Sequence, residues 1–164
     1  MKKLVYLSLG SNLGQREKYL REAISRLQDL GVIRKVSAFY ETQPVGVQKE
    51  QPWFLNCALA METELLPLDF LGRMLAVEQS MGRIRTEPKG PRTIDIDIIF
   101  FGNEVLDTPE LTVPHPAMHQ RRFVLEPLAE IASAFVHPVL KRTVREMLDS
   151  LPADSGLVNK SLSN

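Results

Sequence analysis

Two aspartates, Asp95 and Asp97, stand in a stretch whose pattern suits metal-assisted phosphate chemistry. From Thr93 onward they alternate with isoleucines, and this period of two predicts a β-strand with the isoleucines on one face and both carboxylates on the other. Neighbouring positions on one face of a strand lie about 6.6 Å apart. The two carboxylates can therefore flank one or two Mg²⁺ ions, which lie about 3.5–4 Å from each other in two-metal sites.

The residues before this strand are basic and irregular. They include Arg83, Arg85, Lys89 and Arg92, and the glycines and prolines among them predict a loop. Guanidinium groups bind phosphate oxygens and carboxylates bind hard cations, so the combination predicts a site for a Mg²⁺-bound nucleotide. The alternative is an edge strand with a solvated acidic face, which a lone Asp-x-Asp pattern would favour.

Three further side chains suit a ligand. Phe54 and Asn56 share one face of an expected strand, where they can stack on and hydrogen-bond a flat heterocycle. Core packing and a satisfied amide explain the same pair, and we prefer that interpretation from these residues alone. Glu78 lies at the end of a helical stripe near the basic loop, where it can pair with an arginine or contact a ligand.

Another candidate group follows the aspartate strand. His115 lies between two prolines in an extended run from Leu111 to Pro116, where it can donate a hydrogen bond to a phosphate. Arg121 and Phe123 come shortly after it. For the arginine, phosphate contact competes with plain solvation.

Composition limits the protein class. We expect one domain over residues 1–164, with 152–164 as a frayed tail, and the 20 basic and 20 acidic residues cancel. Zero net charge argues against nucleic acid or an anionic membrane as the main partner. The single cysteine, Cys57, excludes an intramolecular disulfide and favours a reducing cytoplasm. We expect no signal peptide and no membrane span.

Hydrophobic patterning predicts the order strand, helix, strand, strand, helix, strand, then a hairpin at Gly102-Asn103 and a smaller helical end. The strands before the aspartate strand are expected at Lys3–Leu9, Val32–Tyr40 and Trp53–Glu62. The first helix follows a turn that Ser11 or Asn12 caps or buttresses. The second begins at Pro67, and its expected buried stripe contains Leu68, Leu71, Met74 and Leu75. A capping box, Thr143 to Glu146, predicts a last short helix.

This order predicts an α+β fold of the ferredoxin-like type, an α/β sandwich with a mainly antiparallel sheet. Its helices would cover one face, and the other face would carry the ligand sites.

Six segments together resemble the motifs of the 6-hydroxymethyl-7,8-dihydropterin pyrophosphokinases, a family of folate biosynthesis. They occur in the family's order and cover the chain from about Leu4 to about Ile131. The segments are Gly10-Ser11-Asn12-Leu13-Gly14, Phe39-Tyr40-Glu41-Thr42, Phe54-Leu55-Asn56, Met81-Gly82-Arg83, Gly90-Pro91-Arg92-Thr93-Ile94-Asp95-Ile96-Asp97 and Leu111-Thr112-Val113-Pro114-His115-Pro116.

The resemblance implies a monomeric cytoplasmic enzyme that transfers pyrophosphate from MgATP to the hydroxymethyl group of 6-hydroxymethyl-7,8-dihydropterin and releases AMP. Asp95 and Asp97 would bind two Mg²⁺ ions and act in catalysis with Arg83 and Arg92. The implied ATP-binding residues are Glu78, Arg85, Ile98, Thr112, His115 and Arg121. The implied pterin-binding residues are Thr42, Val45, Phe54, Asn56 and Phe123.

Two other functions fit parts of the sequence. Ferredoxin-like sheets also bind single-stranded RNA, but such a module needs exposed aromatic residues and a basic surface, whereas this strand exposes Asp95 and Asp97. A glycosyltransferase using Asp-x-Asp is the second alternative. At 164 residues, without a βαβ nucleotide-binding unit, the chain does not favour it.

Overall fold

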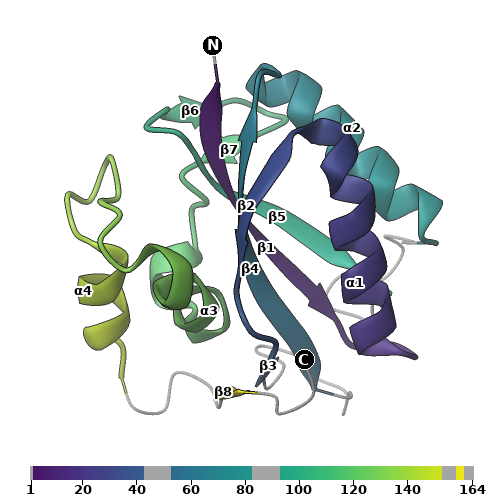
Figure 1. The fold of residues 1–164 in the computed structure, drawn as a ribbon. Helices are drawn as coiled ribbons and strands as arrows, with labels where there is room; N and C mark the ends of the chain where they lie inside the picture. Colours follow the sequence, from purple (N-terminus) through teal and green to yellow (C-terminus); the bar gives the residue numbers. More distant parts are fainter. Residues whose placement is uncertain (1, 43–52, 83–92, 153–157, 161–164) are drawn as a thin grey trace.

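The computed structural model describes residues 2–42, 53–82, 93–152 and 158–160 (Figure 1). The strands are β1 (Lys3–Ser11), β2 (Val32–Val36), β3 (Tyr40–Thr42), β4 (Phe54–Thr63), β5 (Asp95–Phe101), β6 (Leu106–Asp107), β7 (Thr112–Val113) and β8 (Val158–Lys160). The α-helices are α1 (Arg16–Leu27), α2 (Pro67–Ser80), α3 (Arg122–Ala132) and α4 (Val144–Asp149), with 3₁₀ turns at Gln28–Leu30 and Met118–Gln120.

The main sheet has the strand order β5-β1-β4-β3-β8, and β2 also pairs with β4. Every pairing in it is antiparallel. With α1 after β1 and α2 after β4, this is the βαββαβ arrangement of the ferredoxin-like fold. The predicted fold class is confirmed.

Helices α1 and α2 pack on one face of the sheet, where the larger core cluster lies (Figure 1). Leu55, Cys57, Leu59 and Met61 of β4 all face this cluster, as the alternation of that strand predicts. Within α2 the buried stripe differs from the expected one. Phe70, Met74 and Val77 are buried, whereas Leu68 is 48% exposed. Phe70 takes the inward position because its ring packs edge-on against Phe101.

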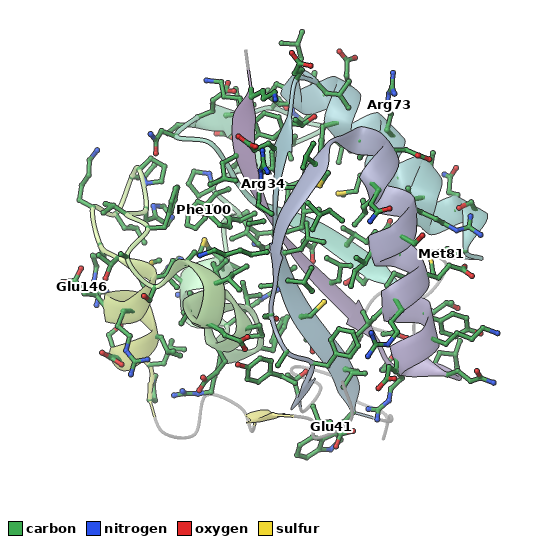
Figure 2. All side chains as sticks on the ribbon, in the orientation of Figure 1. Arg34, Glu41, Arg73, Met81, Phe100 and Glu146 are labelled. Carbon is green, nitrogen blue, oxygen red and sulfur yellow. The ribbon has the colours of Figure 1, made fainter. Side chains whose placement is uncertain are left out.

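The second face of the sheet is partly covered by α3 and α4 (Figure 1). A smaller core lies there, in which Tyr6, Ala58 and Phe100 of the sheet meet residues of the two helices. Figure 2 shows Phe100 on this side of the sheet. The face expected to be left for ligands is therefore shared: helices occupy one part of it, and the candidate site residues of the sheet lie beyond them.

A β-bulge in β5 separates these two parts of the second face. Tyr6 pairs with Phe100, but Leu7 pairs with Ile98, so Ile99 is the extra residue. The bulge shifts the alternation, which puts Ile99 and Phe100 into the second core together. Before the bulge the predicted alternation holds.

The expected single strand Val32–Tyr40 is interrupted. The hydroxyl of Ser37 accepts the N–H of Ala58 at 2.8 Å and donates to the carbonyl of Ala38 at 2.7 Å. A side-chain oxygen thus replaces a backbone acceptor in the ladder with β4. The chain consequently forms two short strands, β2 and β3, instead of one.

Three further expectations differ from the structure. Gly102-Asn103 is a turn, but β6 after it pairs with β7 and not with β5. The N-cap of α1 is Gln15, so neither Ser11 nor Asn12 caps the helix. Within the expected frayed tail, Val158–Lys160 forms β8 and pairs with β3.

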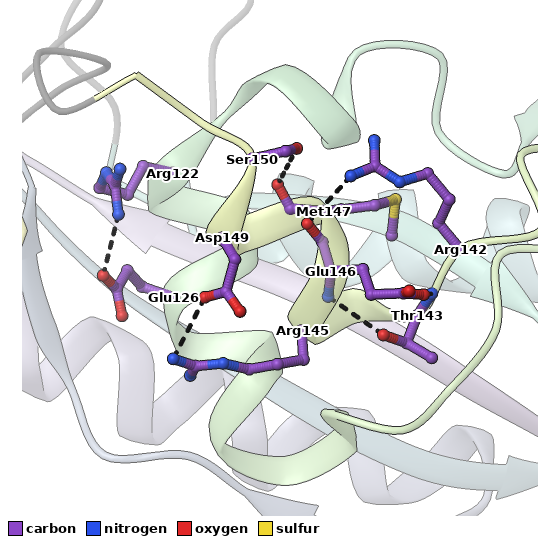
Figure 3. A network of polar contacts seen from close by, with 9 residues as sticks. All are labelled: Arg122, Glu126, Arg142, Thr143, Arg145, Glu146, Met147, Asp149 and Ser150. Carbon is purple, nitrogen blue, oxygen red and sulfur yellow. Dashed lines mark hydrogen bonds and ion pairs between the residues drawn. The ribbon is translucent and has the colours of Figure 1, made fainter.

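The capping box of α4 is confirmed. Glu146 N–H donates to the Thr143 hydroxyl at 3.0 Å, and Thr143 N–H donates to the Glu146 carboxylate at 2.8 Å (Figure 3). Two ion pairs along the helices, Arg122–Glu126 and Arg145–Asp149, lie in the same view. Among the described residues, no helix is both long and apolar enough to cross a bilayer.

Candidate active site

The two aspartates lie at the start of β5 with half-buried side chains, and the isoleucines that alternate with them are buried. Asp95 pairs with Gly10 of β1 and Asp97 pairs with Ser8. Paired residues of antiparallel strands share a face, so both carboxylates lie on the second face of the sheet. The predicted arrangement is confirmed: isoleucines toward α1 and α2, aspartates on the opposite side.

Glu78 fixes the strand that carries the aspartates. β5 is at the end of the strand order, so one of its backbone edges has no partner among the strands that the structure describes. The N–H of Ile96 on this edge donates to Glu78 Oε2 at 2.6 Å. Glu78 is 1% exposed, and a buried carboxylate that accepts a backbone N–H is a strong anchor. Ile96 lies between Asp95 and Asp97, so Glu78 sets the position of both.

Asn56 and Thr42 form a buried polar pair on β4 and β3. The Thr42 hydroxyl donates to Asn56 Oδ1, and Asn56 Nδ2 donates to the carbonyl of Leu9 at 3.3 Å. A carbonyl can only accept, so these two partners define the orientation of the amide. The amide keeps donor and acceptor capacity in one plane, which suits the edge of a heterocycle that offers the complementary pair.

Gly10 of β1 has no side chain and so leaves space for the Asn56 amide. It pairs with Asn56 on one side and with Asp95 on the other. A Cβ at Gly10 would lie 2.5 Å from Asn56 Nδ2 and 3.3 Å from Phe54 Cδ1, so a side chain there would displace the amide. Asp95 and Asn56 are thus separated by one residue that contributes no side chain. Two strand spacings put their Cα atoms about 10 Å apart.

Phe54 and Thr42 are directly paired, so both lie on the second face with Asn56. Phe54 is half-buried, which leaves part of its ring accessible. The structure thus brings these three predicted pterin-site residues together on one face.

His115 borders the aspartate end of this face. The backbone N–H of His115 donates to the carbonyl of Ile99 at 3.0 Å. The ring Nδ1 of His115 accepts the backbone N–H of Ala117 at 3.2 Å. In the neutral ring the proton is therefore on Nε2, which can donate to a ligand. Burial lowers the pKa of His115, the charge of Arg121 lowers it further, and Asp95 raises it. His115, Arg121 and Asp95 are thus close enough to interact electrostatically.

Three further predicted residues take different positions. Thr112 lies on β7, which packs beside β5. Phe123 is in the first turn of α3, and the guanidinium of Arg121 lies over its ring, 5.6 Å from the centroid. Ile98 is 4% exposed and faces the core under α1 and α2. Any contact between Ile98 and a nucleotide would therefore come from its backbone.

Four predicted residues, Arg83, Arg85, Arg92 and Val45, lie outside the described residues, and their roles stay predictions. Sequence reasoning missed the spacing role of Gly10, which it treated only as part of a turn. It also missed Glu130, whose carboxylate accepts the hydroxyl of Tyr40. No periodic signal connects residues so far apart in the chain.

A family model described as 7,8-dihydro-6-hydroxymethylpterin-pyrophosphokinase matches residues 6–133. The chain belongs to this pyrophosphokinase family. A 2-amino-4-hydroxy-6-hydroxymethyldihydropteridine pyrophosphokinase of Bacillus subtilis is 46% identical over 133 residues, which cover 80% of this chain and 79% of that protein. The family match contains all six motif segments between Gly10 and Pro116.

Longer relatives of the pyrophosphokinase family are also similar. The folic acid synthesis protein of Schizosaccharomyces pombe is 40% identical over 164 residues, 99% of this chain but 22% of that protein. A Plasmodium falciparum HPPK-DHPS structure with pteroate superposes with a TM-score of 0.73 at 18% identity, over 91% of this chain and 42% of that one. At that identity the structure shows a shared fold. This chain spans less than a quarter of the fission-yeast relative's length.

Proposed function

We propose that this chain transfers the pyrophosphoryl group of ATP to the hydroxymethyl oxygen of 6-hydroxymethyl-7,8-dihydropterin and releases AMP. One observation carries the proposal. A pair of carboxylates suited to Mg²⁺ and a buried amide suited to a heterocycle lie on one sheet face, with only Gly10 between Asp95 and Asn56. Family membership supports the same reaction, since relatives of similar length carry the enzyme's name.

The donor set fits a magnesium nucleotide. Asp95 and Asp97 would hold the metal, and we infer two ions because the carboxylates are on successive positions of one strand face. When bound, Mg²⁺ neutralises phosphate charge and aligns phosphate oxygens for transfer. Among the described residues, no cluster of three or more metal-binding side chains occurs, so phosphate oxygens and water would complete the coordination.

The protein's own residues position the reactants. His115 donates from Nε2 to a phosphate oxygen, and Arg121 adds positive charge beside it. Thr112 and the backbone of Ile98 border the nucleotide. The buried Glu78, implied by the resemblance as an ATP-binding residue, acts from behind the aspartates by holding the Ile96 N–H. Arg83 and Arg92, with Arg85, absorb charge on the phosphates; these three arginines are assigned by the resemblance.

On the acceptor side, Asn56 and Thr42 bind the polar edge of the pterin, while Phe54 and Phe123 stack on its ring and Val45 adds to the wall. The bound hydroxymethyl oxygen attacks the β-phosphorus in line with the departing oxygen. A new oxygen–phosphorus bond forms, the bond to the α-phosphate oxygen breaks, AMP leaves with that electron pair, and the hydroxyl proton is released. Catalysis thus comes from positioning and charge neutralisation.

Two finer points extend the proposal. We infer a cytoplasmic enzyme because the free thiol of Cys57 is fully buried, where burial raises its pKa to about 12, and it forms no disulfide. We also infer a monomer, as the resemblance to the family implies.

The test is product analysis. Purified protein is incubated with ATP, Mg²⁺ and the reduced pterin, and AMP and the pyrophosphorylated pterin are separated by chromatography. We expect the two products in equal amounts, and nearly none with Asp97→Ala, whose circular dichroism should match the wild type. ADP as the product, or full turnover by Asp97→Ala, would contradict the proposal.

A further inference from the structure

Strand β3 has only three residues, yet it carries Thr42, which fixes the amide of Asn56. The interruption at Ser37 separates it from β2, so β3 is not held as the continuation of a longer strand. Its ladder with β4 consists of three paired positions. On its other edge β3 pairs with β8, again over three positions. Each of these ladders is short, so side-chain contacts to β3 contribute to its placement.

From the second face of the sheet, β3 is bonded by Glu130 of α3. Both carboxylate oxygens accept the N–H of Ala38, at 3.2 and 3.1 Å, and Oε1 also accepts the hydroxyl of Tyr40 at 2.5 Å. Burial raises the pKa of Tyr40 above its ordinary value, and the hydrogen bond to the Glu130 carboxylate raises it further. One charged group thus bonds two points of the chain, just before β3 and at its first residue.

From the opposite face, β3 is bonded by Arg16 in the first turn of α1. Its guanidinium donates to Glu41 Oε1 at 2.5 Å and to the carbonyl of Trp53 at 2.8 Å. Glu41 is the middle residue of β3, and Trp53 directly precedes Phe54. Figure 2 shows Glu41 at the end of the sheet, beside the start of α1. The two nitrogens of Arg16 therefore hold the ends of β3 and β4 together, next to the pair Thr42 and Phe54.

We propose that Arg16 and Glu130 are positioning residues for the acceptor: they hold β3 from the two faces of the sheet and so set the affinity for the pterin. The inference rests on the proposed function, which places the pterin against Thr42, Asn56 and Phe54. Loss of either contact lets β3 shift on β4, and the Thr42–Asn56 hydrogen bond loses its geometry. Neither residue contacts the reacting atoms.

The nucleotide side should not respond. Asp95 and Asp97 lie on β5, which β1 and β4 separate from β3. Their strand is held by Glu78, and the charged contacts of Arg16 and Glu130 do not reach it. A change in β3 should therefore alter the KM for the pterin and leave the KM for ATP unchanged. A general loss of structure would move both.

The experiment measures both KM values for Glu130→Gln, Arg16→Lys and Tyr40→Phe. Glu130→Gln keeps one oxygen acceptor but loses the negative charge. Arg16→Lys keeps the positive charge but loses the two guanidinium nitrogens that bond at once, and Tyr40→Phe removes only the hydroxyl. These contacts are partly exposed, so we expect a rise in pterin KM of about three- to tenfold for Glu130→Gln and Arg16→Lys and a smaller rise for Tyr40→Phe. The KM for ATP should stay within about twofold.

Glu62→Gln is the matched control. Glu62 also accepts from a charged side chain, Arg34, but it lies at the other end of β4 from Asn56. It should leave both KM values unchanged. Trp53 is the only tryptophan of the chain, and quenching of its fluorescence by the pterin gives the pterin Kd without turnover. The Kd should follow the KM.

Each outcome has one meaning. An unchanged pterin KM in all three variants overturns the inference, as does an equal rise in both KM values. If Glu130→Gln or Arg16→Lys does not fold, Tyr40→Phe decides alone, because it removes one hydroxyl from a half-buried ring. A wild-type protein that forms no AMP with the pterin would refute the proposed function instead, which is a separate result.

Discussion

Glu78 holds Ile96, the residue between the two aspartates, through a 2.6 Å hydrogen bond from the Ile96 N–H to its carboxylate. Both partners are buried. A carboxylate on α2 thereby bonds the backbone edge of β5 that points away from β1, between Asp95 and Asp97. The proposed metal-binding pair, Asp95 and Asp97, is therefore positioned from the core side of the sheet, by a residue that does not share its face.

Removing the Glu78 carboxylate should weaken both folding and nucleotide binding. In Glu78→Ala the buried N–H of Ile96 loses its acceptor, which costs about 1–3 kcal/mol of the free energy of unfolding. Glu78→Gln keeps an oxygen for this N–H and should lose less. Urea unfolding and MgATP titration of both variants measure the two effects. Equal stability of the Ala variant and the wild type would contradict the anchoring role.

A methyl group at Gly10 should impair the acceptor site. Its Cβ would lie 2.5 Å from Asn56 Nδ2, so Gly10→Ala must displace the amide from the Leu9 carbonyl and the Thr42 hydroxyl. We expect the pterin KM to rise about tenfold or more. The control is Gly72→Ala on α2, where a Cβ meets nothing within 4 Å. This control should gain about 0.5–1 kcal/mol in stability and keep both KM values. A normal pterin KM in Gly10→Ala would show that the amide is not a binding group.

Acid should destabilise the protein through His137. Its Nδ1 accepts the N–H groups of Val139 at 3.1 Å and Leu140 at 3.0 Å, and burial, then the nearby His119, lowers its pKa below the ordinary 6.5. The unfolded chain therefore binds more protons, so this histidine's contribution is complete above pH 6.5 and is lost as the pH falls through the lowered pKa.

His137→Asn keeps a side-chain acceptor that does not titrate in this range. The Tm of this variant should therefore fall less than that of the wild type when the pH is lowered from about 7.5 to about 5.5. His115 also has a lowered pKa and adds to the pH dependence of the wild type, so the test is the difference between the wild type and His137→Asn. An unchanged pH dependence in His137→Asn would contradict the assignment.

The capping box of α4 should contribute to stability but not to activity (Figure 3). Thr143→Ala removes the acceptor for the Glu146 N–H and should lower the free energy of unfolding by about 0.5–2 kcal/mol. Thr143→Ser keeps the hydroxyl and serves as the control. Both variants should keep the wild-type kcat, because α4 carries no residue assigned to either substrate. Chemical unfolding and steady-state kinetics test the two statements separately.

Patterns with a regular period predicted the centre of the fold. The alternation of β4 and of β5 up to Ile98 identified both faces correctly, because one face of each strand is buried and the other carries polar or small residues. The bulge at Ile99 gave no such signal, since the residues from Ile98 to Phe101 are all apolar and alternation cannot be followed through them.

Contacts between residues far apart in the chain could not be predicted from the sequence, for a physical reason. The alternation from Val32 to Tyr40 continues through Ser37, and only the tertiary bond from Ala58 N–H to its hydroxyl divides the strand. Glu130 and Tyr40 are 90 positions apart, and nothing local marks either as a partner of the other. The pairing of β8 with β3 likewise joins segments far apart in the chain, which no local pattern indicates.

Calorimetric titration of 6-hydroxymethylpterin, with and without Mg²⁺ and a non-hydrolysable ATP analogue, tests the central claim most directly. If the two sites adjoin across Gly10, the Mg²⁺–nucleotide should tighten pterin binding by about tenfold or more. Nucleotide binding with no pterin binding in either mixture would contradict the account, because the site around Asn56 would then serve another acceptor.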